Sequence, residues 1–425
     1  MSSAVPRTAV EDLPAIVLGS HVTGLGVVRC LGLCRIPAYL VSARGDYAAG
    51  SRWARRLRDC PPESPDPEPL ARFLESVPLE RALLLPCSDD WTRAVAALPG
   101  ELRERFASPI APLETIEQFV DKQQFAALVG LLAVPHPRTV VVRRNDPHAL
   151  DGFDFDQADA QLFLKPPDSQ DFVRHFGAKA LAVRDEADAR ARLEEVWATG
   201  MESMLVQEYV PGPASSHYFI DGFVSVDGRM PARLARRRLR MYPRDFGNST
   251  YHVTVPVEEV GDALEHLSRL LSGVGFRGIF SAEFKRDERD GELKILEVNV
   301  RPWWYVHFAA TCGVNVCELA HREARGLAVE PLGDYRIGAR CVLVGADLRA
   351  YLDQRRENGI SLRSLRAPTC FRCRSPGSGS RLLNTTPAAP RHEPSNDRKL
   401  MPFSRRWSRY ARRSAPTRTQ RAPMR

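Results

Sequence analysis

Short apolar runs separated by helical stretches make up residues 14–110. Runs at 15–18, 38–41 and 83–85 are predicted to be buried strands, and a helix is expected over 27–33. Gly19, Gly24 and Gly26 form G-x-x-x-x-G-x-G, which is neither the dinucleotide-binding fingerprint nor a Walker A motif. We therefore interpret them as structural turn glycines. The alternation of strand and helix predicts a parallel sheet in an α/β fold.

Residues 113–138 show helical periodicity. Thr115 and Gln118 have the spacing of a capping box, which predicts that the helix begins there. Phe125, Leu128, Val129 and Leu132 then fall on one helix face, and Val134-Pro-His-Pro137 ends it. Further strands are expected at 162–165, 204–210, 218–226, 279–286 and 293–299, and further helices at 186–199 and 257–271.

The charge is unevenly distributed along the chain. The net charge is +8, but residues 366–425 hold 15 Lys and Arg against 2 Asp and Glu, so the first 365 residues carry a net −5. The basic total is therefore no argument that the body binds nucleic acid. The last 60 residues are rich in Arg, Pro and Ser without apolar periodicity, and we expect a disordered tail.

Cysteine usage and the apolar runs indicate a cytoplasmic location. The nine cysteines are odd in number and scattered, which favours free thiols in a reducing compartment. Cys370 and Cys373 form a lone C-x-x-C, and zinc usually needs four ligands, so no metal role is expected for them. The N-terminus has no signal-like apolar stretch, and the longest apolar run, 125–134, is about half a membrane span.

Two expected strands carry the strongest chemical pattern. Strand side chains alternate with period two, so Glu283 shares a face with Ser281 and Lys285, and Glu297 shares one with Leu293, Ile295 and Asn299. A three-residue loop, 289–291, with Gly291 at positive φ would place residues whose numbers sum to 580 opposite each other. Glu283 and Glu297 would then oppose each other.

Two facing carboxylates repel unless a cation lies between them. Glu283, Glu297 and Asn299 offer three oxygen ligands, which suits Mg²⁺, with Mn²⁺ as a substitute. The alternative is the solvated face of a two-stranded ribbon. Arg301 and the aromatic run 303–305 directly afterwards favour the metal site.

The motif E-x-N-x-R after a strand, with a glutamate 14 residues earlier, resembles the magnesium site of the ATP-grasp superfamily. Other motifs of that family occur in the same order: Asp121-Lys122, Phe163-Leu-Lys165-Pro, and Val206-Gln-Glu208-Tyr-Val210-Pro-Gly. KPPDSQDFVRHFGAKA and RRRLRMYPRDFGNST are similar to the carboxylate–amine ligase branch that includes D-aspartate ligase. The resemblance implies a preATP-grasp domain at 13–112, an ATP-grasp domain at 113–365 with a lid subdomain at about 140–205, and then the tail.

The resemblance also implies roles for individual residues. It assigns ATP phosphates to Lys122, Lys165 and Lys179, and assigns Glu208, Tyr209 and Val210 to the adenine, largely through their backbone. Arg301, with Lys165, is the expected catalytic group, because a planar guanidinium can clamp an anionic intermediate. Relatives carry an acid for the ribose where this chain has Ala214 and Ser215, and the nearest acid is Asp221. One or two of Arg233, Arg236, Arg237 and Arg240 are expected to contact substrate.

These features predict an ATP-dependent ligase that joins a small-molecule or peptide carboxylate to an amine through an acyl phosphate. The alternative is a non-catalytic ATP-binding protein whose basic tail contacts nucleic acid. The expected metal triad and the lysines favour the enzyme. Nucleic acid and a membrane span are not expected for it, and a homodimer is left open.

Overall fold

The computed structural model describes residues 13–42, 46–57, 64–146, 148–151, 153, 155, 161–167, 169–178, 180–243 and 247–358. Lys179, Cys370, Cys373 and the tail lie outside the described residues. By contacts the described residues form two units, one within 13–138 and 210–358, and the other within 139–209. We call these the larger and the smaller unit. Residues 13–112 fall in the larger unit together with 113–138 and 210–358.

The larger unit begins with a parallel sheet of order β3-β2-β1-β4, which confirms the predicted fold class. Its strands are β1 (Ala15–Leu18), β2 (Ala38–Val41), β3 (Ala54–Arg55) and β4 (Leu83–Pro86). The helices are α1 (His21–Leu33), the 3-10 helix η1 (Tyr47–Gly50), α2 (Pro67–Ser76), α3 (Asp89–Ala96) and α4 (Gly100–Arg105).

Only one of the three N-terminal glycines lies in the turn. Gly19 has a φ of +132°, whereas Gly24 and Gly26 lie inside α1. A Cβ on Gly24 would come within 2.8 Å of the Gly19 carbonyl oxygen, and one on Gly26 within 2.9 Å of the Val306 side chain. The interpretation as turn glycines is therefore wrong for two of them, which allow α1 to pack closely against its neighbours.

The predicted helix over 113–138 is two helices, α5 (Leu113–Val120) and α6 (Lys122–Leu131). The capping box is wrong, because Thr115 lies inside α5 and its hydroxyl donates to the Val274 carbonyl. Asp121 separates the helices and caps α6, accepting from the backbone N–H groups of Gln123 and Gln124 at 2.8 and 2.9 Å.

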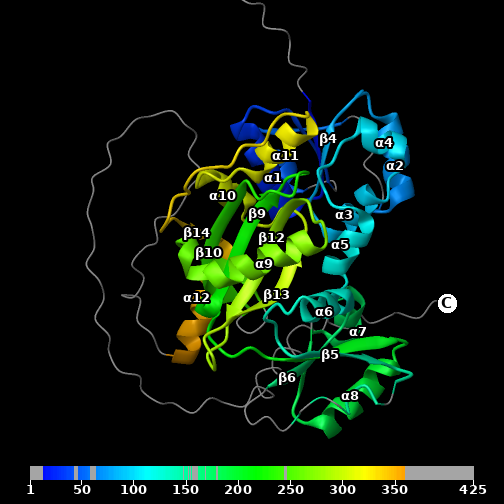
Figure 1. The fold of residues 1–425 in the computed structure, drawn as a ribbon, viewed down its shortest axis with the longest axis vertical. Helices are drawn as coiled ribbons and strands as arrows, with labels where there is room; N and C mark the ends of the chain where they lie inside the picture. The colour runs from blue at the N-terminus through cyan, green and yellow to red at the C-terminus, as the bar shows by residue number, and fades with distance from the viewer. Residues whose placement is uncertain are drawn as a thin grey trace, which may run out of the picture. The chain divides into compact units, whose positions relative to one another are not determined.

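A six-stranded antiparallel sheet of order β13-β12-β9-β10-β11-β14 forms the rest of the larger unit (Figure 1). Its strands are β9 (His217–Val224), β10 (Ala232–Tyr242), β11 (Asn248–Thr254), β12 (Gly278–Arg286), β13 (Leu293–Asn299) and β14 (Arg340–Val342). The helices are η2 (Ala214–Ser216), η3 (Val257–Val260), α9 (Gly261–Gly273), α10 (Val306–Thr311), α11 (Val316–Ala324) and α12 (Val344–Asn358).

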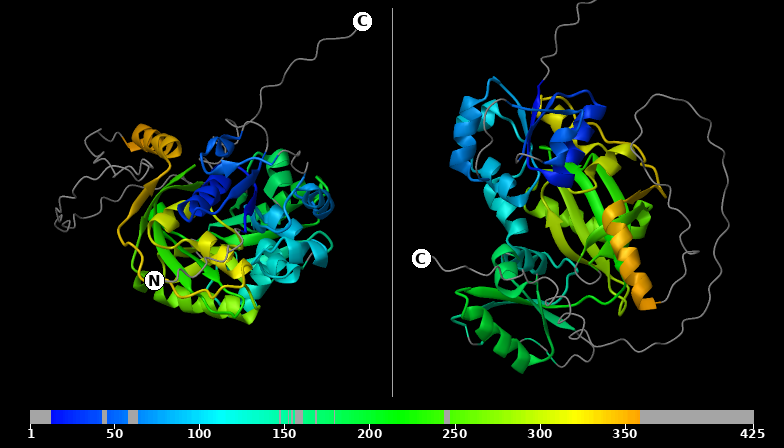
Figure 2. Two further views of the ribbon diagram at one scale, coloured as in Figure 1. Left: turned by 90° about the horizontal axis from the view of Figure 1, so that it is seen from above. Right: turned by 180° about the vertical axis from the view of Figure 1, so that it is seen from behind.

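The two faces of this sheet differ in character. On one face, Phe280, Ala282 and Phe284 of β12 pack with α9 and with α5 and α6 in a closed apolar core. On the other face, Ile279 of β12 packs with α1, α10 and α11 at one end only, and the remainder is polar. We call this second side the polar face. Helix α12 contacts β10 and β11 (Figure 2).

The smaller unit has its own sheet and core. Its antiparallel sheet has the order β5-β8-β6-β7, with β5 (Thr139–Arg143), β6 (Leu162–Lys165), β7 (Leu181–Val183) and β8 (Ser203–Glu208). Helices α7 (Ser169–Phe176) and α8 (Glu186–Trp197) complete it. Leu162, Leu164, Met204 and Val206 pack against Val196 of α8 in one core.

The β12–β13 hairpin reaches the predicted pairing by a different route. Glu283 is opposite Glu297 and Ser281 opposite Asn299, but nearer the loop Phe284 pairs with Ile295. Leu296 is therefore a bulge residue. The loop has four residues, 288–291, because the Asp287 N–H donates to the Glu292 carbonyl, so the predicted three-residue loop is wrong.

The bulge also corrects the predicted faces of β13. Leu293 and Ile295 lie in the core, whereas Glu297 and Asn299 lie on the polar face, so these four residues do not share a side. Val298 takes over the core position beyond the bulge. One extra residue thus turns Glu297 and Asn299 to the face that carries Glu283, without exposing the apolar half of the strand.

Two histidines with lowered pKa values introduce a pH dependence into the larger unit: His252 is buried and His307 is half-buried. Burial, and then the charge of Arg29, lower the pKa of His307 to about 4. Burial lowers the pKa of His252 well below its usual range, and the positive charges of Arg236 and Arg238 lower it further. Both side chains are neutral at pH 7, as expected for packing residues.

No helix among the described residues is both long and apolar enough to cross a membrane.

We predict that Gly291→Val destabilises the hairpin. Gly291 has a φ of +78°, which a β-branched residue resists. The free energy of unfolding should fall by about 1–2 kcal/mol relative to wild type, and Gly291→Asn should lose less, because Asn tolerates this conformation. Urea denaturation measures both variants. Equal stability of the Val and Asn variants would contradict this account of the loop.

We predict that acid weakens the fold between about pH 6.5 and pH 4. There the unfolded chain binds protons at His307 that the native state excludes, so stability falls as pH falls, by at most about 1.4 kcal/mol per pH unit for one histidine. His307→Gln should flatten this slope in urea titrations at several pH values. His21→Gln, at an exposed histidine of the same unit, is the control and should leave it unchanged.

Candidate functional site

Three neighbouring strands change from apolar to polar at nearly the same level of the polar face. Ile279 pairs with Phe223, and Phe223 with Ala232, at the apolar end. Two residues further along β12, Ser281 is opposite Asp221. Two residues further again, Glu283 of β12 pairs with Phe219 of β9, which in turn pairs with Arg236 of β10. Antiparallel register therefore gathers charged side chains from β9, β10 and β12 in one place.

Glu283 is nearly buried and has two donors. The Nδ1 atom of His217 and the Nη2 atom of Arg238 lie 2.7 and 2.9 Å from the same oxygen, Oε1. Burial would raise the pKa of Glu283, but the charge of Arg238 and the bond from His217 lower it to about 2. Burial and the charge of Arg238 lower the pKa of His217 to about 4. Glu283 is therefore a carboxylate at pH 7 beside a neutral imidazole.

Glu297, directly opposite, is exposed and belongs to a chain of contacts. The Nδ2 atom of Asn299 donates to Glu297 Oε1 at 3.2 Å. The Oδ1 atom of Asn299 accepts from Arg301 Nη2 at 2.9 Å. Arg301 also donates to both carboxylate oxygens of Asp89, at 2.8 and 3.1 Å. The predicted residues Glu283, Glu297, Asn299 and Arg301 are thus brought together.

An ion pair lies on the same face next to this group. Arg236 and Asp221, 3% and 0% exposed, meet at 2.6 Å, and Ser281 donates to Asp221 at 2.7 Å. Arg236 also stacks on Phe219, 3.8 Å from the ring centroid, and bonds His252 Nδ1 at 3.1 Å. Because both charges are paired and hydrogen-bonded, the network can remain buried, whereas losing one partner would be costly.

The four arginines expected to contact substrate differ in their surroundings. Arg236 is bound to Asp221, and Arg240 to Asp347 of α12 at 2.9 Å. Arg233 is exposed, and Arg237 pairs with Tyr218, whose side chain lies in the core on the opposite face. Asp221 is fully buried, so it cannot replace the missing ribose acid.

The nucleotide residues expected in the larger unit are Lys122 and Val210. Lys122 is half-buried in the first turn of α6, directly after the cap Asp121. Val210 is 3% exposed. Ala214 and Ser215 lie in η2, which leads into β9.

In the smaller unit, Lys165 and Glu208 point to opposite faces of the sheet. Lys165 pairs with Leu205, whereas Glu208 pairs with Leu162 of the core facing α8. Glu208 is 3% exposed, and the N–H of Tyr209 donates to the Gln161 carbonyl at 2.6 Å. A ligand on the Lys165 face would therefore meet Glu208 through its backbone rather than its side chain.

Four residues around Glu283 and Arg301 were missed by sequence reasoning. Arg238 and His217 contact Glu283, Asp89 holds Arg301, and Lys285 lies buried two residues from Glu283. Burial is the main cause that lowers the pKa of Lys285 to about 8, and the positive charge of Arg238 is the second. Arg238 could have been found, because Arg236, Arg238 and Arg240 alternate with the period of a strand. Asp89 gave no such signal, since it is 212 residues from its partner.

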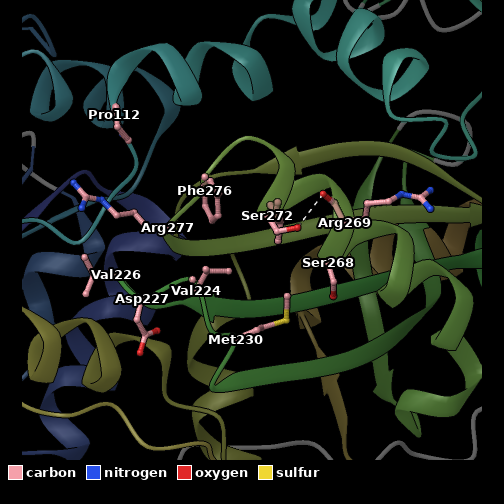
Figure 3. Close-up of a pocket in the computed structure, with 13 residues that line it drawn as sticks. Pro112, Val224, Val226, Asp227, Met230, Ser268, Arg269, Ser272, Phe276 and Arg277 are labelled. Atoms are coloured by element: carbon pink, nitrogen blue, oxygen red, sulfur yellow. Dashed lines mark hydrogen bonds between the residues drawn. The ribbon is translucent and has the colours of Figure 1, made fainter.

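The larger unit also contains a hollow of about 750 Å³ on the α9 side of the sheet (Figure 3). Its lining includes Val224, Asp227, Met230, Phe276 and Arg277, and none of the predicted site residues. Asp227 is paired with Arg229, and Arg277 donates to the Ile110 carbonyl. This hollow lacks the carboxylate pair, so we assign the chemistry to the polar face.

Among the described residues, no group of three or more His, Cys, Asp or Glu side chains has a metal-binding arrangement. The predicted metal site does not have that composition, because it combines two carboxylates with the amide of Asn299 and would need water or phosphate oxygens to complete it.

Part of the chain matches a known family in sequence, and most of it is similar to a known ligase. Residues 200–341 match a family described as ATP-grasp in the biosynthetic pathway with Ter operon. This segment contains most of the six-stranded sheet and the whole β12–β13 hairpin. The chain is also similar to a D-aspartate ligase of Enterococcus faecium (strain Aus0004), with 23% identity over 373 residues, 82% of this chain and 86% of that protein.

Solved structures share the fold. An N5-carboxyaminoimidazole synthetase from Staphylococcus aureus, complexed with ADP, has a TM-score of 0.60 at 11% identity, covering 82% of this chain and 86% of that one. An L-amino acid ligase from Bacillus licheniformis has a TM-score of 0.54 at 13% identity, covering 74% of each chain. The sequence match over residues 200–341 relates this part of the chain to an ATP-grasp family, and the solved structures show that the fold is shared.

Proposed function

We propose that the chain is an ATP-dependent carboxylate–amine ligase whose reaction takes place on the polar face. The observation that carries this proposal is the pairing of Glu283 with Glu297, beside Asn299 and Arg301, on two antiparallel strands of an ATP-grasp fold. The resemblance to a D-aspartate ligase supports the reaction class. A cytoplasmic location, where ATP is available, is part of the proposal.

The donor set fits Mg²⁺. Glu283 and Glu297 contribute carboxylates, and Asn299 an amide oxygen, and all three are hard oxygen ligands. Both hydrogen bonds to Glu283 end on Oε1, which leaves Oε2 for a cation. When bound, Mg²⁺ or Mn²⁺ would neutralise charge on the β- and γ-phosphates of ATP. The lowered pKa keeps Glu283 ionised for this task at any physiological pH.

The proposed reaction has two steps. A substrate carboxylate oxygen attacks the γ-phosphorus of ATP, which forms an acyl phosphate and releases ADP. The amine nitrogen then attacks the acyl carbon, which releases phosphate and a proton and leaves an amide. Anionic charge develops in both steps, and we assign its stabilisation to the guanidinium of Arg301, which is held by Asp89.

The nucleotide contacts remain those that the resemblance implies. Lys122, Lys165 and Lys179 are assigned to the phosphates, and the backbone of Glu208, Tyr209 and Val210 to the adenine. The position of the Glu208 side chain on the α8 face supports a main-chain role for that residue.

The reaction class is tested by trapping the acyl phosphate. With ATP, Mg²⁺ and the matched acid, hydroxylamine should replace the amine and yield a hydroxamate, while ADP and phosphate form in equal amounts. We would screen amino acids and dicarboxylates as acids. ATP turnover that never depends on an acid, or binding of ATP with no turnover for any pair of acid and amine, would contradict the ligase.

We predict that Glu297→Gln lowers turnover by more than about a hundredfold, because the transition-state charge loses part of its counterion while the shape is kept. Steady-state kinetics with ATP and a matched substrate pair measures the effect. Glu292→Gln is the control, since Glu292 is an exposed residue of the same hairpin. Full turnover in the Glu297 variant would contradict the metal assignment.

A further inference from the structure

We propose that Asp89, in the first turn of α3, is a positioning residue that keeps the guanidinium of Arg301 away from Glu297 and so leaves Glu297 open to the cation. This inference rests on the proposed function, because it assumes that Glu297 binds a divalent metal. Asp89 comes from the N-terminal parallel-sheet region, whereas Arg301 follows β13, and both belong to the larger unit.

The contact between Asp89 and Arg301 is bidentate. Nε of Arg301 lies 2.8 Å from one carboxylate oxygen of Asp89 and Nη2 lies 3.1 Å from the other. Two parallel bonds fix the plane of the guanidinium as well as its position. The Arg301 side chain is 18% exposed and that of Asp89 is 37% exposed, so water screens this pair only in part.

The same guanidinium reaches toward the metal site through Asn299. Nη2 of Arg301 donates to Oδ1 of Asn299, and Nδ2 of Asn299 donates to Glu297. An amide turned the other way would set its N–H groups against a guanidinium that also only donates. Asp89, by holding Arg301, therefore also fixes the orientation of Asn299, one of the proposed metal ligands.

Without the Asp89 carboxylate, the next anion along this chain of contacts is Glu297. An arginine side chain stays charged at any physiological pH, so it would be attracted to that exposed carboxylate. Glu283 already accepts from Arg238. A second guanidinium on Glu297 would give each acidic residue its own arginine and reduce the attraction for a divalent ion.

The charge balance leads to the same conclusion. Asp89, Glu283 and Glu297 are negative, and Arg238 and Arg301 are positive, which gives a net charge of −1 for these five side chains. Loss of the Asp89 charge makes the sum zero. Lys285 adds one positive charge to both sums when protonated, so the difference between them is unaffected. Asp89 thus contributes to cation binding without touching the cation.

The test is Mn²⁺ binding to the full chain in the presence of a non-hydrolysable ATP analogue, followed by electron paramagnetic resonance. Asp89→Asn should weaken Mn²⁺ binding by about fivefold or more. Asp90→Asn is the matched control, since Asp90 lies in the same helical turn. Its contact with Arg93 is weak, because the two charged groups are 3.9 Å apart. Mn²⁺ binding to this control variant should stay within about twofold of wild type.

Two further variants separate positioning from folding. Asp89→Glu keeps the charge and should recover most of the Mn²⁺ affinity. In an Arg301→Gln background the competing guanidinium is absent, so Asp89→Asn should cause a clearly smaller loss, which comes from its charge alone. Equal losses in the Asp89 and Asp90 variants, or the same loss with and without Arg301, would overturn the inference.

Comparing Glu297→Gln with Asp89→Asn distinguishes a failure of this inference from a failure of the proposed function. If Glu297→Gln leaves Mn²⁺ binding unchanged, the metal assignment itself fails. If Glu297→Gln abolishes binding while Asp89→Asn matches wild type, the metal assignment holds and only the role of Asp89 fails.

Discussion

The pairing of β12 with β13 is the constraint on which the candidate site depends. Two opposing glutamates are unfavourable in a sheet, and a register slip of one residue would turn one of them into the core. The bulge at Leu296 lets Leu293 and Ile295 fill the core on one side while Glu297 and Asn299 face Glu283 on the other. The apolar packing that stabilises the hairpin therefore also holds two like charges together, which is the arrangement that a divalent cation requires.

The rest of the polar face follows from the cost of burying charge. Arg236, Arg238 and Arg240 alternate along β10, and each meets an acid from a different element: Asp221 of β9, Glu283 of β12 and Asp347 of α12. The pairs with Glu283 and Asp347 join elements 45 and 107 residues apart, so the network specifies how these elements fit together as well as lowering the cost of desolvation. Among these acids, Glu283 is the one that lies opposite a second, exposed carboxylate, that of Glu297. We therefore assign the proposed metal site to Glu283 rather than to Asp221 or Asp347.

Charge also connects the two sheets of the larger unit. Arg301 follows directly from the E-x-N-x-R strand, but its geometry is set by Asp89 at the start of α3. The N-terminal region thus contributes to the candidate site through electrostatics, in addition to the apolar contacts of α1 with α10 and α11. A domain that would otherwise be described as structural support takes part in arranging the proposed catalytic group.

The sequence by itself determined the fold class, the parallel N-terminal strands and the motif order, because these depend on short local patterns. It predicted that Glu283 opposes Glu297, but by the wrong route, because the loop has four residues and the bulge at Leu296 restores the pairing. It misjudged Gly24, Gly26, the Thr115 cap and the loop length, where several local conformations suit the same residues. It could not identify Asp89 or His217, and it did not single out Arg238. Their roles arise only when β9, β10, β12 and α3 come together, since burial and pairing are decided by neighbours far away in the chain.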